Sequence, residues 1–215
     1  MKKINWRYAL GEIIIVMIGI SLAFALNRWN EGRKENALKK LYLQGLSIDL
    51  EKEAAHLMEN DSLIRVKISM ISNILQQLNE NENYKALSGV FEIANVVEFY
   101  PENVTYLAMV NSGDMKLIDD FELRKKIEEH YNKSHQNTQN NFERIVNINK
   151  EYLGEFFIKE IDYSLLRSGK VDFLEKPILG NILRSLQGAY KLAIKANNDC
   201  LNSNKELLEA IKAVN

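Results

Sequence analysis

An apolar run at residues 8–26, YALGEIIIVMIGISLAFAL, contains Glu12 as its only charged residue. A helix rises about 1.5 Å per residue, so a run of this length covers roughly the hydrocarbon core of a bilayer. Trp6 and Tyr8 lie at one end and Trp29 at the other, where amphipathic rings favour the headgroup layer. The run therefore predicts a transmembrane helix in a lipid bilayer, with these three aromatic residues as interfacial anchors.

The same run could belong to a cleaved signal peptide, because Lys2, Lys3 and Arg7 precede it and residues 23–25, Ala-Phe-Ala, fit a cleavage site. However, the run is longer than the apolar region of a signal peptide, and the sequence after that site continues as helix with an interfacial Trp. We therefore favour an uncleaved single-pass anchor with a short basic tail over residues 1–30. Residues 31–215 would then form one extramembrane domain.

The charges on the two flanks of this anchor give conflicting indications of its orientation. Residues 1–40 carry eight Lys or Arg and three Glu, although the whole chain has a net charge of −1. A count of positive residues would place the large domain in the cytoplasm, but long C-terminal domains cross largely regardless of charge. A short basic tail would also have to cross against the membrane potential. We favour the basic tail in the cytoplasm and the large domain on the outer side of the membrane. The rest of the sequence has no basic stripe, so we do not expect nucleic acid as a partner.

One face of the predicted anchor has small residues in its middle and polar residues at its ends. This anchor stripe consists of Glu12, Val16, Gly19, Ala23, Asn27 and Asn30. Small residues let two membrane helices approach closely, so the stripe favours packing against a second copy or another membrane protein. Small residues are also common in any membrane helix, and the stripe alone does not decide between these interpretations.

Glu12 is costly inside a bilayer, and such an acid is by default a candidate functional residue. It could carry protons in an ion-coupled energising subunit. It could equally reach the interface, or pair with Arg7 or a neighbouring subunit. Because Glu12 lies about one helical turn past Tyr8, where the cost of a charge falls, we favour the second interpretation.

Apolar residues recur at every seventh position after the anchor, at Leu43, Leu50, Leu57, Ile64, Ile71 and Leu78. A second, less regular row contains Leu46, Ala54, Ile68 and Leu75. Sustained heptads with polar residues between them predict a coiled-coil-like or bundle seam. We therefore expect one nearly continuous helix over residues 5–78.

Two short helices are expected at 84–97 and 103–112, with Pro101 near the start of the second and Gly113 as its left-handed cap. A capping box of Asp119 and Glu122 begins a long helix that ends near residue 161. Its polar middle, residues 134–141, predicts either a protruding solvated turn or the polar end of the bundle. Residues 162–177 are expected to form a loop, and residues 178–213 a last helix.

No segment of strand periodicity competes with these helices. The sequence thus predicts an all-α fold in which the N-terminal transmembrane helix continues into an elongated antiparallel bundle. The bundle would contain three long helices and a short helix pair, because short connections favour antiparallel neighbours.

The sequence contains no catalytic motif that we recognise: no Gly-rich phosphate loop, no Gly-x-Ser-x-Gly elbow and no HExxH. The histidines are His56, His130 and His135. The last two are five residues apart, so they would not share one face of an α-helix. We therefore expect no metal site, no cofactor and no enzymatic activity.

Cys200 is the only cysteine, which excludes an internal disulfide, and we expect it to be a small buried core residue. The aromatic residues Phe142, Tyr152, Phe156 and Phe157 could line a ligand pocket, but their helical spacing fits a bundle core better. Whether a small molecule binds is left open.

Two segments carry a family resemblance. INWRYALGEIIIVMIGISLAFALNRWNEGRKE resembles the N-terminus of an uncharacterised family of single-span membrane proteins common in Bacteroidota, a family of unknown function. VNSGDMKLIDDFELRKKIEEHY resembles the turn and helix that follow in the same family. The resemblance implies a bacterial inner-membrane protein with a helical extramembrane domain, which would be largely periplasmic in our preferred orientation. It implies no activity, cofactor or catalytic residue.

Three functions remain. The first is a membrane-anchored helical bundle that acts through protein–protein interaction, as a homo-oligomer or with another membrane protein. The alternative is an extracytoplasmic ligand-sensing bundle without its own output domain, which would need an apolar pocket between the long helices. The third, less favoured, is an ion-coupled energising subunit that uses Glu12.

Overall fold

The computed structural model describes the backbone of Trp6–Val214 and the side chains of residues 10–214. All regular elements in this part of the chain are helical, which confirms the all-α class. Lys2 and Lys3 of the basic tail, and the side chains of the predicted anchors Trp6 and Tyr8, lie outside the described residues.

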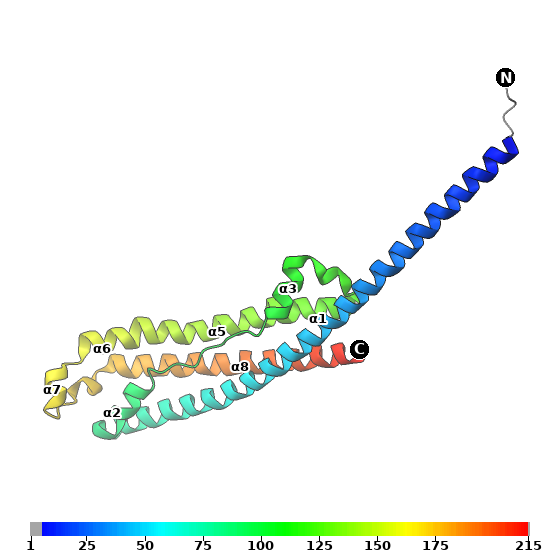
Figure 1. Ribbon diagram of the computed structural model, residues 1–215. Helices are drawn as coiled ribbons and strands as arrows, with labels where there is room; N and C mark the ends of the chain where they lie inside the picture. Colours follow the sequence, from blue (N-terminus) through cyan, green and yellow to red (C-terminus); the bar gives the residue numbers. More distant parts are fainter. Residues whose placement is uncertain (1–5, 215) are drawn as a thin grey trace.

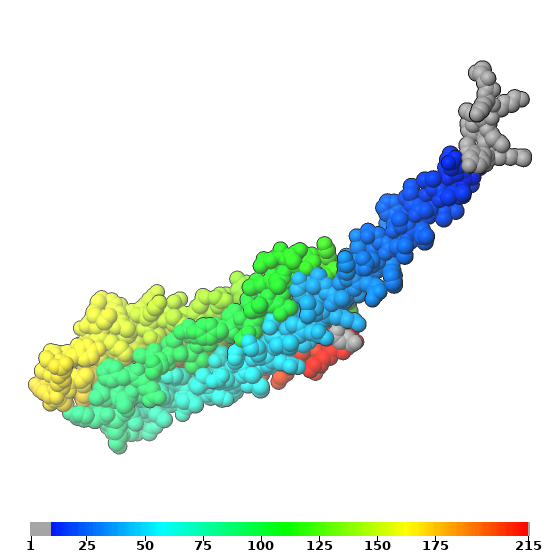
Figure 2. Space-filling view, viewed as in Figure 1, coloured from blue at the N-terminus to red at the C-terminus, as the bar shows by residue number. Residues whose placement is uncertain are grey.

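The first long helix, α1, runs from Trp6 to Asn79 without a break, close to the predicted bounds of 5–78. Its first third forms an arm that stands clear of the bundle, and the rest packs within it (Figure 1). Figure 2 shows the same division as a narrow arm joined to an elongated body. The heptad row is buried to 2 % exposure or less at Leu43, Leu50, Leu57, Ile64 and Ile71, and Leu78 is half-buried. This row is therefore a seam inside the chain's own bundle.

The second long helix is a chain of helical elements that follow one another directly. These are α4 (Phe121–Glu128), the π turn η2 (Glu129–Ser134), α5 (His135–Ile148), the π turn η3 (Asn149–Leu153) and α6 (Gly154–Glu160). The third long helix, α8, spans Pro177–Val214. Both agree with the predicted ranges. The polar stretch 134–141, however, lies in the middle of the second helix and is neither a protruding turn nor an end of the bundle.

The three long helices do not all alternate in direction. α8 is antiparallel to the other two, whereas α1 and the helix from α4 to α6 run parallel (Figure 1). The two ends of the core agree with this arrangement, because the start of the seam on α1 packs with α4 and the end of α8. The end of the seam packs with α5, α6 and the start of α8. The predicted antiparallel arrangement is therefore wrong for this one pair.

A long crossover between residues 80 and 120 makes the parallel pair possible. The short helix α2 (Asn83–Glu92) turns the chain at the far end of α1, and residues 93–103 return along the bundle without helical structure. The short helix α3 (Val104–Ser112) lies at the arm end (Figure 1). The connection is long and places the short pair at opposite ends, so the rule for short connections does not apply.

Several predicted helix ends need correction. α2 stops at Glu92 rather than at residue 97, and Pro101 lies in the returning segment before α3. Gly113 adopts the predicted left-handed conformation, with φ 74°. Residues 162–177 include a short helix, α7 (Tyr163–Arg167), and a 3₁₀ turn, η4 (Asp172–Glu175), rather than loop alone.

The N-cap of α4 is Asp120 and not the predicted Asp119. A carboxylate oxygen of Asp120 accepts hydrogen bonds from the backbone N–H groups of Glu122 and Leu123. Asp119 instead pairs with Lys39 at 2.7 Å and so joins this turn to α1.

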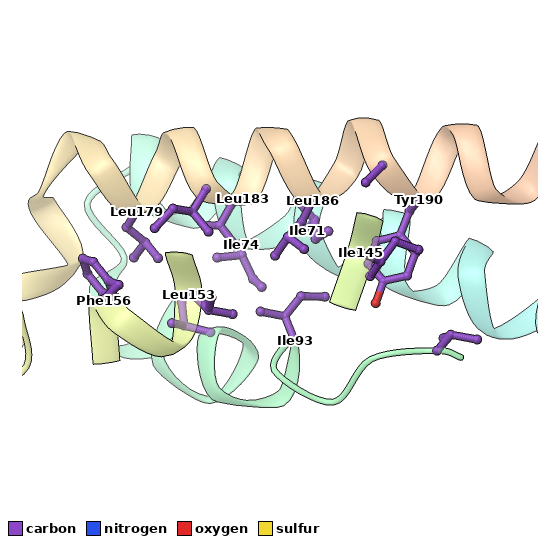
Figure 3. Packing of buried hydrophobic residues seen from close by; sticks show 14 of the residues in the cluster. Ile71, Ile74, Ile93, Ile145, Leu153, Phe156, Leu179, Leu183, Leu186 and Tyr190 are labelled. Carbon is purple, nitrogen blue, oxygen red and sulfur yellow. The ribbon is translucent and has the colours of Figure 1, made fainter. Parts of the chain in front are cut away.

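The core consists of two hydrophobic clusters. The proximal cluster, near the arm, contains Leu43, Leu46, Leu50, Tyr106, Met109, Ile118, Leu123, Ile127, Tyr131, Leu207 and Ile211. The larger distal cluster joins the far halves of α1 and α8 to α2, α5 and α6. Figure 3 shows its packing around Ile71, Ile74, Ile93, Ile145, Leu153, Phe156, Leu179, Leu183, Leu186 and Tyr190.

The four aromatic residues on the second helix divide between core and surface. Phe142 and Phe156 are buried in the distal cluster, Phe157 packs against it, and Tyr152 is 55 % exposed. Tyr152 and Phe156 border a surface hollow of only about 120 Å³. This is below the roughly 300 Å³ at which small-molecule pockets begin, so these aromatics are mainly core residues.

Candidate functional site

A layer of polar side chains separates the proximal and distal clusters. This polar layer consists of Glu53 on α1, His130 and His135 at the two ends of the π turn, Thr138 on α5, and Asn197 and Asn204 on α8, each 4 % exposed or less. Cys200 on α8 lies among them and is fully buried. Burying a polar group without a partner costs stability, so the layer is the least expected part of this core.

The π turn η2 brings the two histidines together. The backbone N–H of His135 donates to the carbonyl of His130, which is the i to i+5 hydrogen bond of a π turn. In an α-helix these residues would point well apart, but the wider turn places them on one face. Their ring centroids are 4.8 Å apart. The expectation that these histidines do not share a face is therefore wrong, because it assumed α-helical geometry throughout.

Glu53 is the centre of the layer. Its Oε2 lies 2.7 Å from His130 Nε2 and accepts a hydrogen bond from the Asn204 amide at 2.8 Å. The same amide donates to the carbonyl of Leu50 at 3.0 Å. The other oxygen, Oε1, lies 2.5 Å from His135 Nε2. This carboxylate therefore joins all three long helices at one point.

Four buried atoms of the layer have no well-directed hydrogen bond in the described part of the chain: Glu53 Oε1, His135 Nε2, Asn197 Oδ1 and Asn204 Oδ1. Glu53 Oε1 and His135 Nε2 are close to each other but poorly aligned. His130 is better satisfied, because its Nδ1 lies 3.1 Å from the Ser203 hydroxyl on α8. The hydrogen bond with Ser203 orients the His130 ring, and no corresponding hydrogen bond orients the His135 ring within the described residues.

Burial by itself would raise the pKa of Glu53. The hydrogen bond with His130, the short contact with His135 and the positive charge of both imidazoles outweigh burial and lower that pKa to about 2. Glu53 is thus an ionised carboxylate in the core at neutral pH. A buried charge of this kind must be matched by an opposite charge close by.

The neighbouring thiol and phenol remain protonated. Burial raises the pKa of Cys200 to about 12, and the charge of Glu53 acts in the same direction, partly offset by a hydrogen bond with Thr138. Burial and nearby carboxylates also raise the pKa of Tyr131, whose ring stacks on Tyr106 with centroids 4.5 Å apart. Neither group is an activated nucleophile or base.

Four groups in the layer could act as metal ligands. One oxygen of Glu53, one ring nitrogen each of His130 and His135, and the Sγ of Cys200 all lie within 4.8 Å of one another, and all four residues are buried. His56, the third histidine, is apart from them. Its ring is half-exposed and lies 3.4 Å from Glu102 on the surface.

The residues predicted as an anchor stripe lie elsewhere. From Glu12 to Asn30 every stripe residue is exposed on the arm of α1. A Cβ added to Gly19 would meet nothing within 4 Å. Asn27 donates a hydrogen bond to Glu31 at 3.1 Å on its own helix. The interfacial residue Trp29 is 63 % exposed and is stacked by the Arg33 guanidinium. The stripe lies on the arm of α1 and the polar layer lies between the three long helices, so the two are separate regions.

The profile of DUF6090, a family of unknown function, matches residues 12–165, which is well over half of the chain. The chain belongs to the DUF6090 family. This confirms the resemblance to a family of unknown function. The DUF6090 match includes the arm, Glu53 and both histidines of the polar layer, and it ends before α8 with Cys200 and Asn204. No curated protein and no solved structure matches this DUF6090 chain.

The polar layer carries a signal in the sequence of this DUF6090 protein that the search for short motifs missed. On α1, Glu53 stands seven residues after the buried Leu46. On α8, Leu183, Tyr190, Asn197, Asn204 and Ile211 form one seven-residue row, and all five are buried. Polar residues at apolar heptad positions on two helices indicate a polar interior layer.

Proposed function

We propose that this DUF6090 protein is a single-pass protein of a bacterial inner membrane, whose bundle lies in the periplasm and acts through protein–protein interaction rather than catalysis. One observation carries the proposal: the arm of α1 is exposed and apolar, and it continues into the bundle as one helix. It is also long and apolar enough to cross a membrane.

A surrounding lipid bilayer explains the exposed apolar surface of the arm better than contact with a single protein partner does. Ile13, Ile14 and Ile15 are consecutive and are 59 %, 48 % and 71 % exposed, so apolar surface points in several directions around the helix. A helix that is apolar all round is one that is surrounded by apolar material, whereas one partner helix would need only one stripe. A continuous exposed apolar surface of this kind is typical of a site that contacts a membrane or a protein.

Membrane anchoring and orientation can be tested together on the full chain. After cell lysis, we expect the protein to stay in the membrane fraction during extraction with alkaline carbonate. For orientation, the exposed Ser185 is changed to Cys and intact spheroplasts are treated with a membrane-impermeant maleimide. Because the native Cys200 is buried, the unmodified protein gives the background. Labelling only after lysis would place the bundle in the cytoplasm and contradict this part of the proposal.

Self-association through the anchor stripe is the second part of the proposal. Gly19 has no side chain and open space beside it, and Ala23, one turn later, has only a methyl group. A second copy of the helix could therefore approach closely at this face. Ala23 and Ala25 provide a matched pair, because both are exposed alanines and they lie on roughly opposite faces of α1. In native membranes, we expect an oxidant to give disulfide-linked dimers of Ala23→Cys and not of Ala25→Cys. Equal cross-linking of both, or none, would count against a specific dimer face.

The ligand-sensing alternative is less well supported. A surface groove of about 430 Å³ lies between α1 and the returning segment, lined in part by His56, Leu63, Val96 and Tyr100. It is open to solvent and does not lie between the long helices, where a sensing bundle needs its pocket. The ion-coupled alternative depends on Glu12 alone, and a Glu12→Gln variant with every phenotype intact would remove it.

A further inference from the structure

We propose that Glu53, His130, His135 and Cys200 form a binding site for one divalent transition-metal ion of the zinc class, buried between the three long helices. The proposal goes beyond the anchoring and interaction functions and does not depend on them.

The positions of the four donor atoms fit a small cation with little rearrangement. Ligands at about 2.0 to 2.3 Å from a tetrahedral ion are separated from one another by roughly 3.2 to 3.8 Å. The four donor atoms lie within 4.8 Å of one another. The two histidine nitrogens lie 2.5 and 2.7 Å from the Glu53 oxygens. An ion between these groups would therefore draw Cys200 inward and move the carboxylate slightly away from the imidazoles.

The donor types select the class of ion. Two imidazole nitrogens, one carboxylate oxygen and one sulfur are typical ligands of Zn²⁺ and related ions. Calcium and magnesium take six or more oxygen ligands, which this set cannot provide.

Two of the unsatisfied atoms in the layer are a second indication of a ligand. Glu53 Oε1 and His135 Nε2 are fully buried and have no well-directed hydrogen bond among the described residues. A metal ion would accept a lone pair from each of them, whereas a direct hydrogen bond needs an alignment that they do not have. The ion would thus satisfy both atoms, which lie 2.5 Å apart.

A second set of contacts would orient the ligands. When His130 binds a metal through Nε2, its Nδ1 carries the proton and can donate to the Ser203 hydroxyl, which lies 3.1 Å away. The Asn204 amide holds the Glu53 carboxylate in place at 2.8 Å. Metal-binding histidines and carboxylates in proteins usually have such outer partners.

The charges also balance. The Cys200 thiol loses its proton to solvent when its sulfur binds the ion, so a thiolate and the Glu53 carboxylate together neutralise a divalent cation. Both histidines bind the ion as neutral imidazoles and release to solvent any proton that they carry in the metal-free protein. A buried site with no net charge avoids the cost of an unmatched charge in the core.

The first test is a Co²⁺ titration of the full chain in detergent, after removal of metal with a chelator. Cobalt reports its coordination in its absorption spectrum. We expect one Co²⁺ per chain, intense bands of tetrahedral coordination, a thiolate-to-cobalt charge-transfer band, and loss of all three when Zn²⁺ is added. Failure to bind Co²⁺ at a fixed stoichiometry, or the weak spectrum of a six-coordinate ion, would overturn the proposal.

Variants then assign the ligands. We expect Cys200→Ser to remove the charge-transfer band and to weaken binding more than tenfold, and His135→Gln to weaken it similarly. Ser203→Ala removes only an outer partner and should weaken binding about 10-fold to 100-fold. His56→Gln, on the surface, is the control and should bind as the unmodified chain does. Equal loss in the control would show that the binding is elsewhere.

Circular dichroism of each variant separates loss of the site from loss of the fold. If Cys200→Ser or His135→Gln unfolds, Ser203→Ala and the thermal shift of the unmodified chain decide the question. Zn²⁺ should raise the melting temperature of the metal-free protein, because binding to the folded state alone stabilises it. No shift at saturating Zn²⁺ would contradict the proposal.

Discussion

His130 Nε2 lies 2.7 Å from Glu53 Oε2 in the interior of the bundle, where neither side chain is more than 1 % exposed. This contact joins the seam of α1 to the π turn of the second long helix, 77 residues later in the chain. The partners of a buried charge depend on each other strongly, because removing one leaves the other unmatched in a medium of low polarity.

We expect Glu53→Gln to lower the free energy of unfolding by about 3 to 5 kcal/mol, the usual effect of breaking a buried ion pair. The measurement is denaturant unfolding of the full chain in detergent with a chelator present. Glu102→Gln is the control, because Glu102 pairs with Lys52 and His56 at the surface, where such pairs contribute about 0 to 1 kcal/mol. Similar losses in both variants would mean that Glu53 is not specially coupled to the core.

The same carboxylate predicts a loss of stability in acid. The pKa of Glu53 falls from 4.5 to about 2 on folding, so its contribution to stability is complete above about pH 4.5. That contribution is lost as the pH falls from 4.5 towards 2, because the unfolded chain takes up the proton first. Unfolding curves of the unmodified protein and of Glu53→Gln should therefore converge over this range. A difference independent of pH would contradict the low pKa.

The π turn η2 predicts an unusual tolerance to deletion. A π turn contains one residue more than an α-helical turn, so deletion of the exposed Lys133 should convert it to α-helix. The two histidines would then be four residues apart and still on one face. Deletion of the exposed Asn140 in α5 would instead rotate every later residue by about 100° and move core side chains to the surface.

Thermal unfolding of the two deletion variants measures this difference. We expect the chain without Lys133 to stay folded with a moderately lower melting temperature, and the chain without Asn140 to lose cooperative unfolding. If both deletions are equally damaging, the π turn is not the adjustable element that we infer.

Two glycines should respond to alanine with opposite signs. Gly113 has φ 74°, where an L-residue is strained, so Gly113→Ala should cost about 1 to 2 kcal/mol of stability. Gly188 is an exposed residue inside α8, and a Cβ there meets nothing within 4 Å. Gly188→Ala should therefore add about 0.5 to 1 kcal/mol through its higher helix propensity. The free energies of unfolding of both variants, measured by denaturant unfolding, check these two predictions.

Much of the fold could be predicted from the sequence because apolar periodicity reports which side of a helix is buried. Leu43 to Ile71 and the ends of α8 followed from spacing alone. The direction of the second long helix could not be predicted in this way. It depends on residues 93–103, which run back along the bundle without helical structure and so have no helical periodicity. A short connection was assumed where the chain crosses the whole length of the bundle.

The polar layer could not be predicted by the α-helical rule that was applied to it. His130 and His135 face each other only because one extra residue widens the turn between them, and that widening has no sequence motif of its own. Asn197 and Asn204 were more accessible to prediction. They interrupt a seven-residue row of α8 that is otherwise apolar at Leu183, Tyr190 and Ile211, and that exception is visible without a structure.

Both core clusters include residues of α8, and the polar layer takes Asn197, Cys200 and Asn204 from it as well. This has a consequence for the order of events during synthesis. The arm of α1 emerges from the ribosome before the bundle, and if it inserts into a membrane, the heptad seam and Glu53 follow while α8, which covers them, has not yet been made. The nascent protein must therefore keep the apolar seam and the Glu53 carboxylate exposed to solvent until α8 has been translated. Such an exposed seam invites association with other chains, so this period is the one in which the protein depends most on chaperones.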